Sequence, residues 1–225
     1  MPRPSTGDSL NLFRRFAEEG FARLVSDLGN PLFMPPIVLI AVAFLLGQPV
    51  FSIAKVFGIA VVCYTILPFA LTIYLLKQGI IESVDLPIRN SRHALYGFSI
   101  LTAGAAVYGI HGFVGYADPF LLILPIVFLI NLAIAFLLNL KWKISVHTAS
   151  VAVAGSIYGY LYFFGTPEYP LITIILSLFH LLLLLPIMVW GRYHLEAHSA
   201  GELIGGSSSG ILLTVAEIII IQYLW

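Results

Sequence analysis

Charged side chains are scarce in this chain of 225 residues, where Asp, Glu, Lys and Arg together make up only 10%. Soluble domains carry about 25%, so the composition excludes a large water-soluble domain. The single cysteine, Cys63, excludes an internal disulfide. The 11 basic and 11 acidic residues cancel, so the net charge indicates no partner, and no nucleic-acid partner is expected.

Apolar residues are abundant instead, at 60% of the chain, and the mean hydropathy is +0.99. A bilayer core of about 30 Å is crossed by roughly 20 apolar residues in a helix. Backbone groups in lipid must also find their hydrogen bonds within the protein. The sequence therefore predicts an all-α fold, a polytopic membrane helix bundle of six to seven transmembrane helices. The predicted spans are residues 32–51, 54–76, 94–116, 120–140, 146–164, 171–190 and 203–225. The first span is the least regular, because Pro31, Pro35 and Pro36 crowd its start.

Residues 1–30 carry more charge than the rest. Apolar side chains recur there near helical spacing with charges on the other face, which predicts an N-terminal amphipathic interfacial helix; a frayed soluble leader is the alternative. The predicted apolar face consists of Leu10, Phe13, Phe16, Ala17, Phe21, Leu24 and Leu28. This stretch has no apolar signal-peptide core, so we expect no cleavable signal. Residues 31–225 would form a single integral-membrane domain.

Three charged clusters lie between the predicted spans, at residues 82–93, 141–147 and 191–206. Two spans separate each cluster from the next, and an even number of crossings returns the chain to the same side. The opposite connections carry only Lys55, His111, Asp118 and Glu168. The sequence thus predicts that all three clusters meet at one membrane face.

The groups at that face suit a phosphate. The cations there are Arg89, Arg92, Lys141, Lys143 and Arg192. Such cations bind phosphate oxygens, and the N-terminus of the predicted helix 146–164, near Ser145 and His147, adds the positive end of a helix dipole. Histidines at such a site would transfer protons or attack phosphorus. His198 and Glu202 are four residues apart and would share a helix face, where the carboxylate could orient the imidazole.

Three stretches in chain order carry a family resemblance: DLPIRNSRH at residues 85–93, KISVH at residues 143–147 and GRYHLEAHSAGE at residues 191–202. They resemble the three motifs of the type 2 phosphatidic acid phosphatase superfamily, K-x6-R-P, P-S-G-H and S-R-x5-H-x3-D. Asp85 stands where the first motif has its lysine, and His93 where it has its proline. In the third, Gly191 replaces the serine and Glu202 the aspartate. The resemblance spans residues 85–206.

The resemblance implies an integral-membrane lipid phosphatase that uses no metal and no cofactor. His198 would be the nucleophile and form a phosphohistidine, Glu202 would orient it, and His147 would protonate the leaving lipid oxygen. The phosphate would be held by Arg192, Arg89, Arg92, Lys143, Ser145 and the Val146 amide. The substrate would be a membrane lipid phosphate or an isoprenoid diphosphate.

Several alternatives remain open from the residues. Glu202 is one methylene longer than the aspartate of the third motif, and the first motif is degenerate. These two departures leave open that the chain is a catalytically weak or repurposed relative of the family. A small membrane transporter would need polar groups near mid-membrane, where only Asn131, His180 and Glu217 are predicted. A histidine-ligated haem or quinone protein is a third possibility. We expect a helix–helix hydrogen bond at His180, a protonated or paired Glu217, and close helix packing over residues 205–210.

Charge placement predicts the orientation, because basic residues in short loops collect on the cytoplasmic side. The four proposed phosphate ligands among the cations are left out of this comparison. The remaining ones on the N-terminal side are Arg3, Arg14, Arg15, Arg23, Lys77 and Lys141, against Lys55 on the other. We therefore expect the N-terminus and the site to face the cytoplasm from a bacterial inner membrane. The resemblance implies the outer face for many bacterial members.

Overall fold

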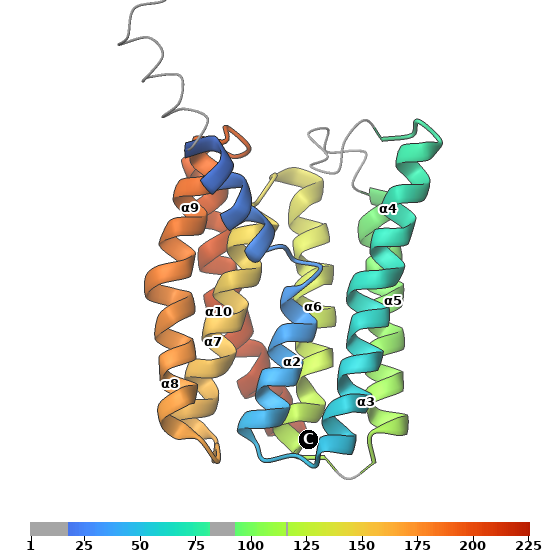
Figure 1. The fold of residues 1–225 in the computed structure, drawn as a ribbon, viewed down its shortest axis with the longest axis vertical. Helices are drawn as coiled ribbons and strands as arrows, with labels where there is room; N and C mark the ends of the chain where they lie inside the picture. Colours follow the sequence, from blue (N-terminus) through green and yellow to red (C-terminus); the bar gives the residue numbers. More distant parts are fainter. Residues whose placement is uncertain (1–17, 82–92, 116) are drawn as a thin grey trace, which may run out of the picture.

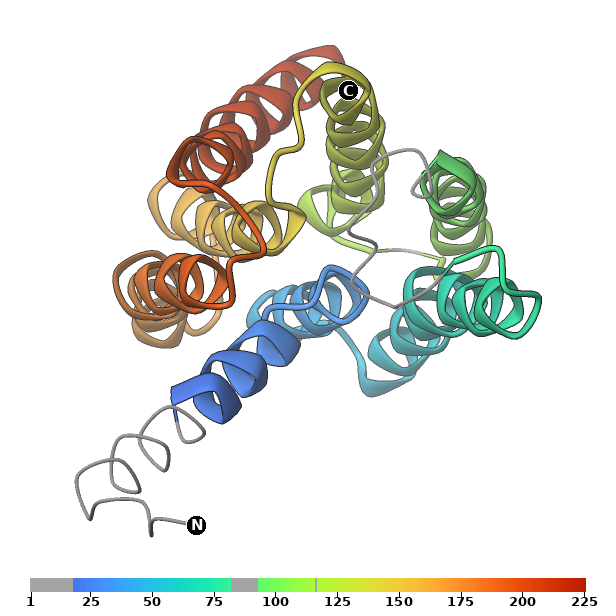
Figure 2. The same cartoon turned by 90° about the horizontal axis from the view of Figure 1, so that it is seen from above.

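The computed structural model describes residues 18–81, 93–115 and 117–225, which form helices joined by short loops (Figure 1). Residues 18–28 form a helix that precedes α2 (Met34–Leu45). The rest are the rod α3–η1–α4 (Val50–Ala60, Val61–Ile66, Leu67–Lys77), α5 (His93–Phe113), α6 (Pro119–Lys141), α7 (Val146–Phe164), the rod α8–η3–α9 (Pro170–Leu178, Phe179–Leu184, Leu185–His194) and α10 (Ala200–Leu224). Seen from above in Figure 2, α2 and α6 lie between the α3–α5 side and the α7–α10 side.

Five of these rods are long and apolar enough to cross a membrane, which confirms a membrane protein: Val50–Lys77, His93–Phe113, Pro119–Lys141, Pro170–His194 and Ala200–Leu224. α7 has 19 residues and runs through the interior of the bundle, where ten of its residues are buried. Its apolar content is diluted by Ser, Thr, Gly and Tyr, as suits a helix surrounded by protein rather than lipid.

The predicted first span, 32–51, is shorter than expected. α2 ends at Leu45 after 12 residues, about 18 Å at 1.5 Å per residue. Gly47 then turns the chain with φ of 62°, and Pro49 precedes the first residue of α3. The backbone N–H of Glu168, in the loop between α7 and α8, donates to the Leu45 carbonyl at 2.7 Å and joins that loop to this turn.

Two rods contain a π-helical turn, and each of these turns ends two residues before a proline. The segment Val61–Ile66 precedes Pro68, and Phe179–Leu184 precedes Pro186. Proline has no N–H, and its ring clashes with the carbonyl four residues earlier. A locally widened turn is one way in which a helix accommodates such a break while its rod stays continuous.

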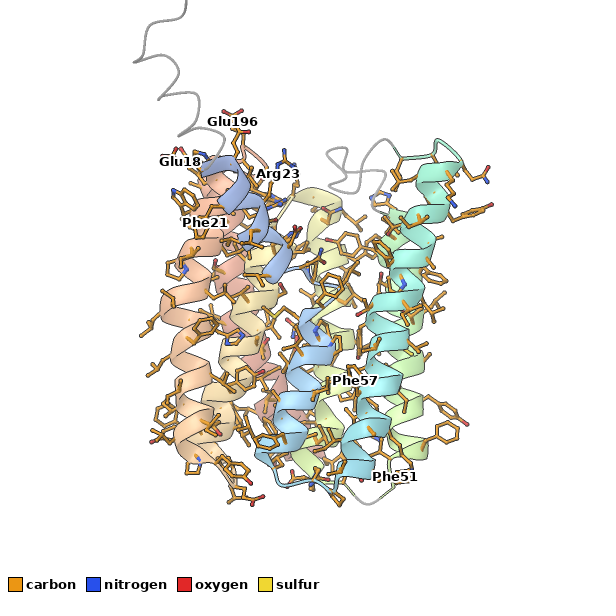
Figure 3. The ribbon with its side chains drawn as sticks, in the orientation of Figure 1. Glu18, Phe21, Arg23, Phe51, Phe57 and Glu196 are labelled. Atoms are coloured by element: carbon orange, nitrogen blue, oxygen red, sulfur yellow. The ribbon has the colours of Figure 1, made fainter. Side chains whose placement is uncertain are left out.

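The predicted common face is confirmed for the described ends of the helices. α4, α6 and α9 end, and α5, α7 and α10 begin, at the same end of the bundle (Figure 1). The side chains of Glu18, Arg23 and Glu196 lie at this end in Figure 3, while Phe51 marks the opposite end. We call it the charged end. It also holds the helix of residues 18–28.

That N-terminal helix contacts the bundle through a face different from the predicted one. Ala22, Val25 and Ser26 are buried. Phe21 and Leu24, from the predicted apolar face, are 50% and 57% exposed and are available to other apolar surroundings. The small buried residues let the helix approach α9 closely.

The predicted close packing over residues 205–210 is confirmed between α7 and α10. A Cβ added at Gly210 would lie 2.6 Å from the Ala149 carbonyl oxygen, and one at Gly206 would collide with the Ser145 carbonyl. Only glycine permits this approach, which is the usual role of small residues at helix interfaces in membranes.

We therefore expect Gly206→Val to lower the stability of the protein in detergent by about 1–3 kcal/mol, the usual cost of overpacking a filled interface. Thermal unfolding of the purified variant measures this. Gly104→Ala on α5 is the matched control, because a Cβ there meets nothing within 4 Å. An unchanged unfolding temperature for Gly206→Val would contradict the tight α7–α10 contact.

Candidate active site

His198 and Glu202 form the predicted pair at the charged end. His198 Nδ1 lies 3.0 Å from Glu202 Oε2. The same Oε2 accepts the Ser199 backbone N–H at 3.1 Å, and Ser199 Oγ accepts the Glu202 N–H at 3.4 Å. This capping box fixes the first turn of α10 and with it the carboxylate. The longer arm of Glu202, compared with aspartate, folds back to serve both the helix cap and the imidazole.

The environment of His198 favours its neutral form. Burial lowers the pKa of His198 below its usual value, the charges of Arg192 and Lys143 lower it further, and the hydrogen bond to Glu202 opposes them. A carboxylate only accepts hydrogen bonds, so the Nδ1 of a neutral His198 must carry the proton. The lone pair then sits on Nε2, as nucleophilic attack requires.

The two cations near His198 are both held by hydrogen bonds. Lys143 Nζ donates to the Ala197 carbonyl oxygen at 3.2 Å, next to His198 in the chain. Arg192, in the last turn of α9, is only 4% exposed, and its Nη1 donates to Ser26 Oγ at 2.7 Å. A positive field is therefore built in at the point where an anion would meet His198.

A cavity of about 410 Å³ runs between the helices beside the His198–Glu202 pair. His198, Arg192 and His147 line it, and His147 lies in the first turn of α7. Most of the other lining side chains are apolar, including Leu95, Phe128, Leu132 and Leu213, and Asn131 of α6 is a polar exception. The cavity thus joins a cationic, histidine-bearing mouth to an apolar interior.

The remaining predicted phosphate ligands differ in their positions. Val146 lines the cavity at the first residue of α7. Ser145 is fully buried, and its Oγ accepts the Thr148 N–H at 3.4 Å as the cap of α7. The Ser145 hydroxyl thus serves as a helix cap, and its predicted role as a phosphate ligand stays a prediction. Arg89 and Arg92 lie outside the described residues, as does Asp85; α4 ends and α5 begins at the charged end.

Two further predictions, and one aromatic contact, concern residues away from the cavity mouth. Glu217 Oε2 accepts from Asn131 Nδ2 of α6 at 2.7 Å, which confirms the pairing with a neighbouring span. The predicted helix–helix hydrogen bond of His180 is wrong: its Nδ1 lies 2.7 Å from the Leu176 carbonyl, four residues earlier in the same rod. His194 stacks on Trp190, with ring centroids 5.2 Å apart.

Ser26 is the residue of this site that the sequence did not indicate. It lies in a segment outside the three motif stretches, 166 positions before its partner Arg192. The only available signal was its place beside small residues on the N-terminal helix. Within the residues described, no group of three His, Cys, Asp or Glu side chains is placed to hold a metal ion.

Comparisons with protein-family models, with curated proteins and with solved structures found no match to this chain.

Proposed function

We propose that the chain is an integral-membrane lipid phosphatase that works through a phosphohistidine, as the resemblance implies. The observation that carries the proposal is the pair of buried His198 and half-buried Glu202 at the cationic mouth of a largely apolar cavity. A charged headgroup and an apolar chain need these two environments side by side. The substrate would be a lipid phosphate or an isoprenoid diphosphate.

The first chemical step forms one bond and breaks another at phosphorus. His198 Nε2 attacks the terminal phosphorus, the bond to the bridging oxygen breaks, and His147 gives that oxygen a proton. The lipid alcohol, or a lipid monophosphate from a diphosphate, leaves. Arg192 and Lys143 stabilise the charge that builds on the phosphoryl oxygens. Glu202 retains its hydrogen bond to Nδ1 and stabilises the charged ring.

The second step removes the phosphoryl group with water. His147, now neutral, accepts a proton from the water as its oxygen attacks phosphorus, and the bond to Nε2 breaks. Inorganic phosphate leaves, and His198 and His147 return to their starting protonation states. The apolar interior of the cavity holds the lipid chain and keeps bulk water away from the first step.

In the membrane, we infer that α2 and α7 cross together with the five long rods, giving the predicted seven crossings. This places the charged end and the helix of residues 18–28 on one side. By the distribution of basic residues, that side is the cytoplasmic face of a bacterial inner membrane.

A small transporter is the second candidate, because the cavity reaches a polar group inside the bundle. Asn131 Nδ2 donates to Thr214 Oγ1 at 3.1 Å as well as to Glu217, and Asn131 lines the cavity. Polar clusters at this depth mark transport sites in many carriers. Phosphate release by the purified protein separates the two functions.

We expect inorganic phosphate release from a detergent-solubilised panel that contains phosphatidic acid, phosphatidylglycerophosphate and undecaprenyl diphosphate. Release should persist in EDTA, because the proposed site binds the phosphoryl group through cations and a covalent histidine. Orthovanadate, which mimics five-coordinate phosphorus, should block it. Strict dependence on added magnesium, or no release from any lipid, would contradict the proposal.

We expect His147→Ala to slow lipid phosphate hydrolysis about 100-fold, within the usual range for a lost general acid. The loss should be much smaller on an aryl phosphate, whose leaving group departs without a proton. Comparing kcat for both substrates measures the difference. Equal losses on the two would remove His147 from the role of general acid.

A further inference from the structure

The N-terminal helix reaches the phosphate site through one buried contact. Arg192 Nη1 donates to Ser26 Oγ at 2.7 Å, and the two residues are 4% and 6% exposed. Ser26 and its neighbour Asp27 line the cavity together with Arg192. The contact therefore lies at the cavity mouth and not on the outer surface of the bundle.

The helix of residues 18–28 is fixed against α9 by close packing. A Cβ added at Gly191 would lie 3.4 Å from the Ala22 carbonyl oxygen and 3.7 Å from a methyl group of Val25. One residue earlier in each helix, the rings of Phe21 and Trp190 lie 5.8 Å apart between centroids. Gly191 directly precedes Arg192, so the contact that holds the N-terminal helix against α9 also fixes the backbone position from which the Arg192 side chain extends.

The far end of the helix is tied to other parts of the bundle. Ser150 Oγ of α7 donates to the Gly29 carbonyl at 2.8 Å. Thr65 Oγ1 of η1 donates to the Leu32 carbonyl at 2.6 Å. With both ends held, Ser26 has little freedom to follow a moving arginine.

We propose that this helix is a working part of the phosphate site and that Ser26 is a positioning residue that aims the guanidinium of Arg192. The inference rests on the proposed function. Arginine has many rotamers, and anchoring one of its nitrogens reduces what must be ordered when a phosphate binds.

The chemistry of the anchor supports this role. A serine hydroxyl accepts the hydrogen bond without bringing a negative charge of its own to the guanidinium. A carboxylate in the same place would neutralise it, since Arg–carboxylate pairs are strong and often bidentate. Asp27 is adjacent and also lines the cavity, yet the acceptor is Ser26. The neutral residue occupies the contact, as a site built for phosphate needs.

The test compares kcat/KM for phosphate release by full-length variants in detergent. Ser26→Ala should lower it about tenfold, mainly through KM, in line with the loss of a hydrogen bond to a charged group. Ser26→Thr, which retains a hydroxyl, should recover most of the loss. Thr65→Val is the matched control: it also removes a hydroxyl bond to the N-terminal segment, far from Arg192, and should stay within twofold of the parent.

A double-mutant cycle tests whether Ser26 acts through the arginine. In an Arg192→Lys background, Ser26→Ala should cost less than twofold, because the contact is already lost. Parent-like activity of Ser26→Ala, or the same tenfold loss in both backgrounds, would overturn the proposal.

A binding measurement keeps the inference separate from the proposed function. If the parent releases no phosphate, the proposed function fails, and thermal unfolding with orthovanadate decides the role of Ser26. Vanadate should raise the parent's unfolding temperature, and Ser26→Ala should remove most of that rise while Thr65→Val retains it. No rise in the parent, or an equal rise in Ser26→Ala, would overturn the inference.

Discussion

His198→Ala should reduce phosphate release from lipid phosphates by on the order of 10⁴-fold or more, the scale seen when a catalytic nucleophile is removed. The attacking atom in the account is Nε2 of His198, and alanine offers no substitute. In this variant, hydrolysis would require water to attack the phosphorus of the lipid phosphate directly, without the covalent intermediate that the proposed mechanism uses. Expression and unfolding temperature should change little, because His198 packs at the mouth of the cavity and is outside the α7–α10 contact.

His194→Ala is the matched control for this variant. It removes a histidine four positions earlier, whose ring stacks on Trp190 and which has no place in the proposed chemistry. Its kcat/KM should remain within a few-fold of the parent value. A His198→Ala protein that retained more than a few per cent of parent turnover would remove His198 from the role of nucleophile.

Glu202→Gln should lower kcat by on the order of 10³-fold while the fold persists. An amide can donate a hydrogen bond to Nδ1, which favours the tautomer with the proton on Nε2 and blocks attack; the equivalent change in a serine protease triad costs about 10⁴. Because Oε2 is the acceptor for both Nδ1 and the Ser199 N–H, an amide nitrogen turned toward Nδ1 also gives up the bond from Ser199, while the backbone N–H at position 202 still donates to Ser199 Oγ and retains half of the capping box. Unfolding temperature and kcat measured on the same preparation separate these two effects.

The pH profile gives Glu202→Gln a second signature. Glu202 raises the pKa of His198 against the larger lowering by burial. Removing the carboxylate should therefore move the acid limb of kcat/KM to lower pH. Glu196→Gln, in the exposed turn before His198, is the control and should leave both kcat and the limb unchanged. Parent-like kcat in Glu202→Gln would contradict the orienting role.

Much of the architecture was predictable, because hydrophobic length and glycine placement are local signals. Long apolar runs predicted the rods, and the small residues of α10 predicted its approach to α7. The spacing of His198 and Glu202 predicted their contact, because the capping box starts α10 at Ala200 and brings both side chains to its first turn.

The misses share a different physical cause. α2 ends early because Gly47 turns the chain at positive φ. The apolar residues on both sides of Gly47 read as one continuous span, so hydrophobicity alone does not predict this turn. The His180 ring contacts the Leu176 carbonyl four residues earlier in its own rod, a local contact that competes with any bond to a neighbouring helix. The hydrogen bond between Ser26 and Arg192 depends on how two segments 166 positions apart pack together. The spacing of residues within either segment does not predict that contact.

The central claim, a covalent phosphohistidine at His198, is tested most directly by trapping it. Purified protein would be mixed with a lipid phosphate labelled with ³²P on its terminal phosphoryl group and quenched within one turnover. The account predicts a protein-bound label that is lost in acid and kept in alkali, absent from His198→Ala and longer-lived in His147→Ala. Phosphate release without any labelled protein, or undiminished labelling of His198→Ala, would contradict it.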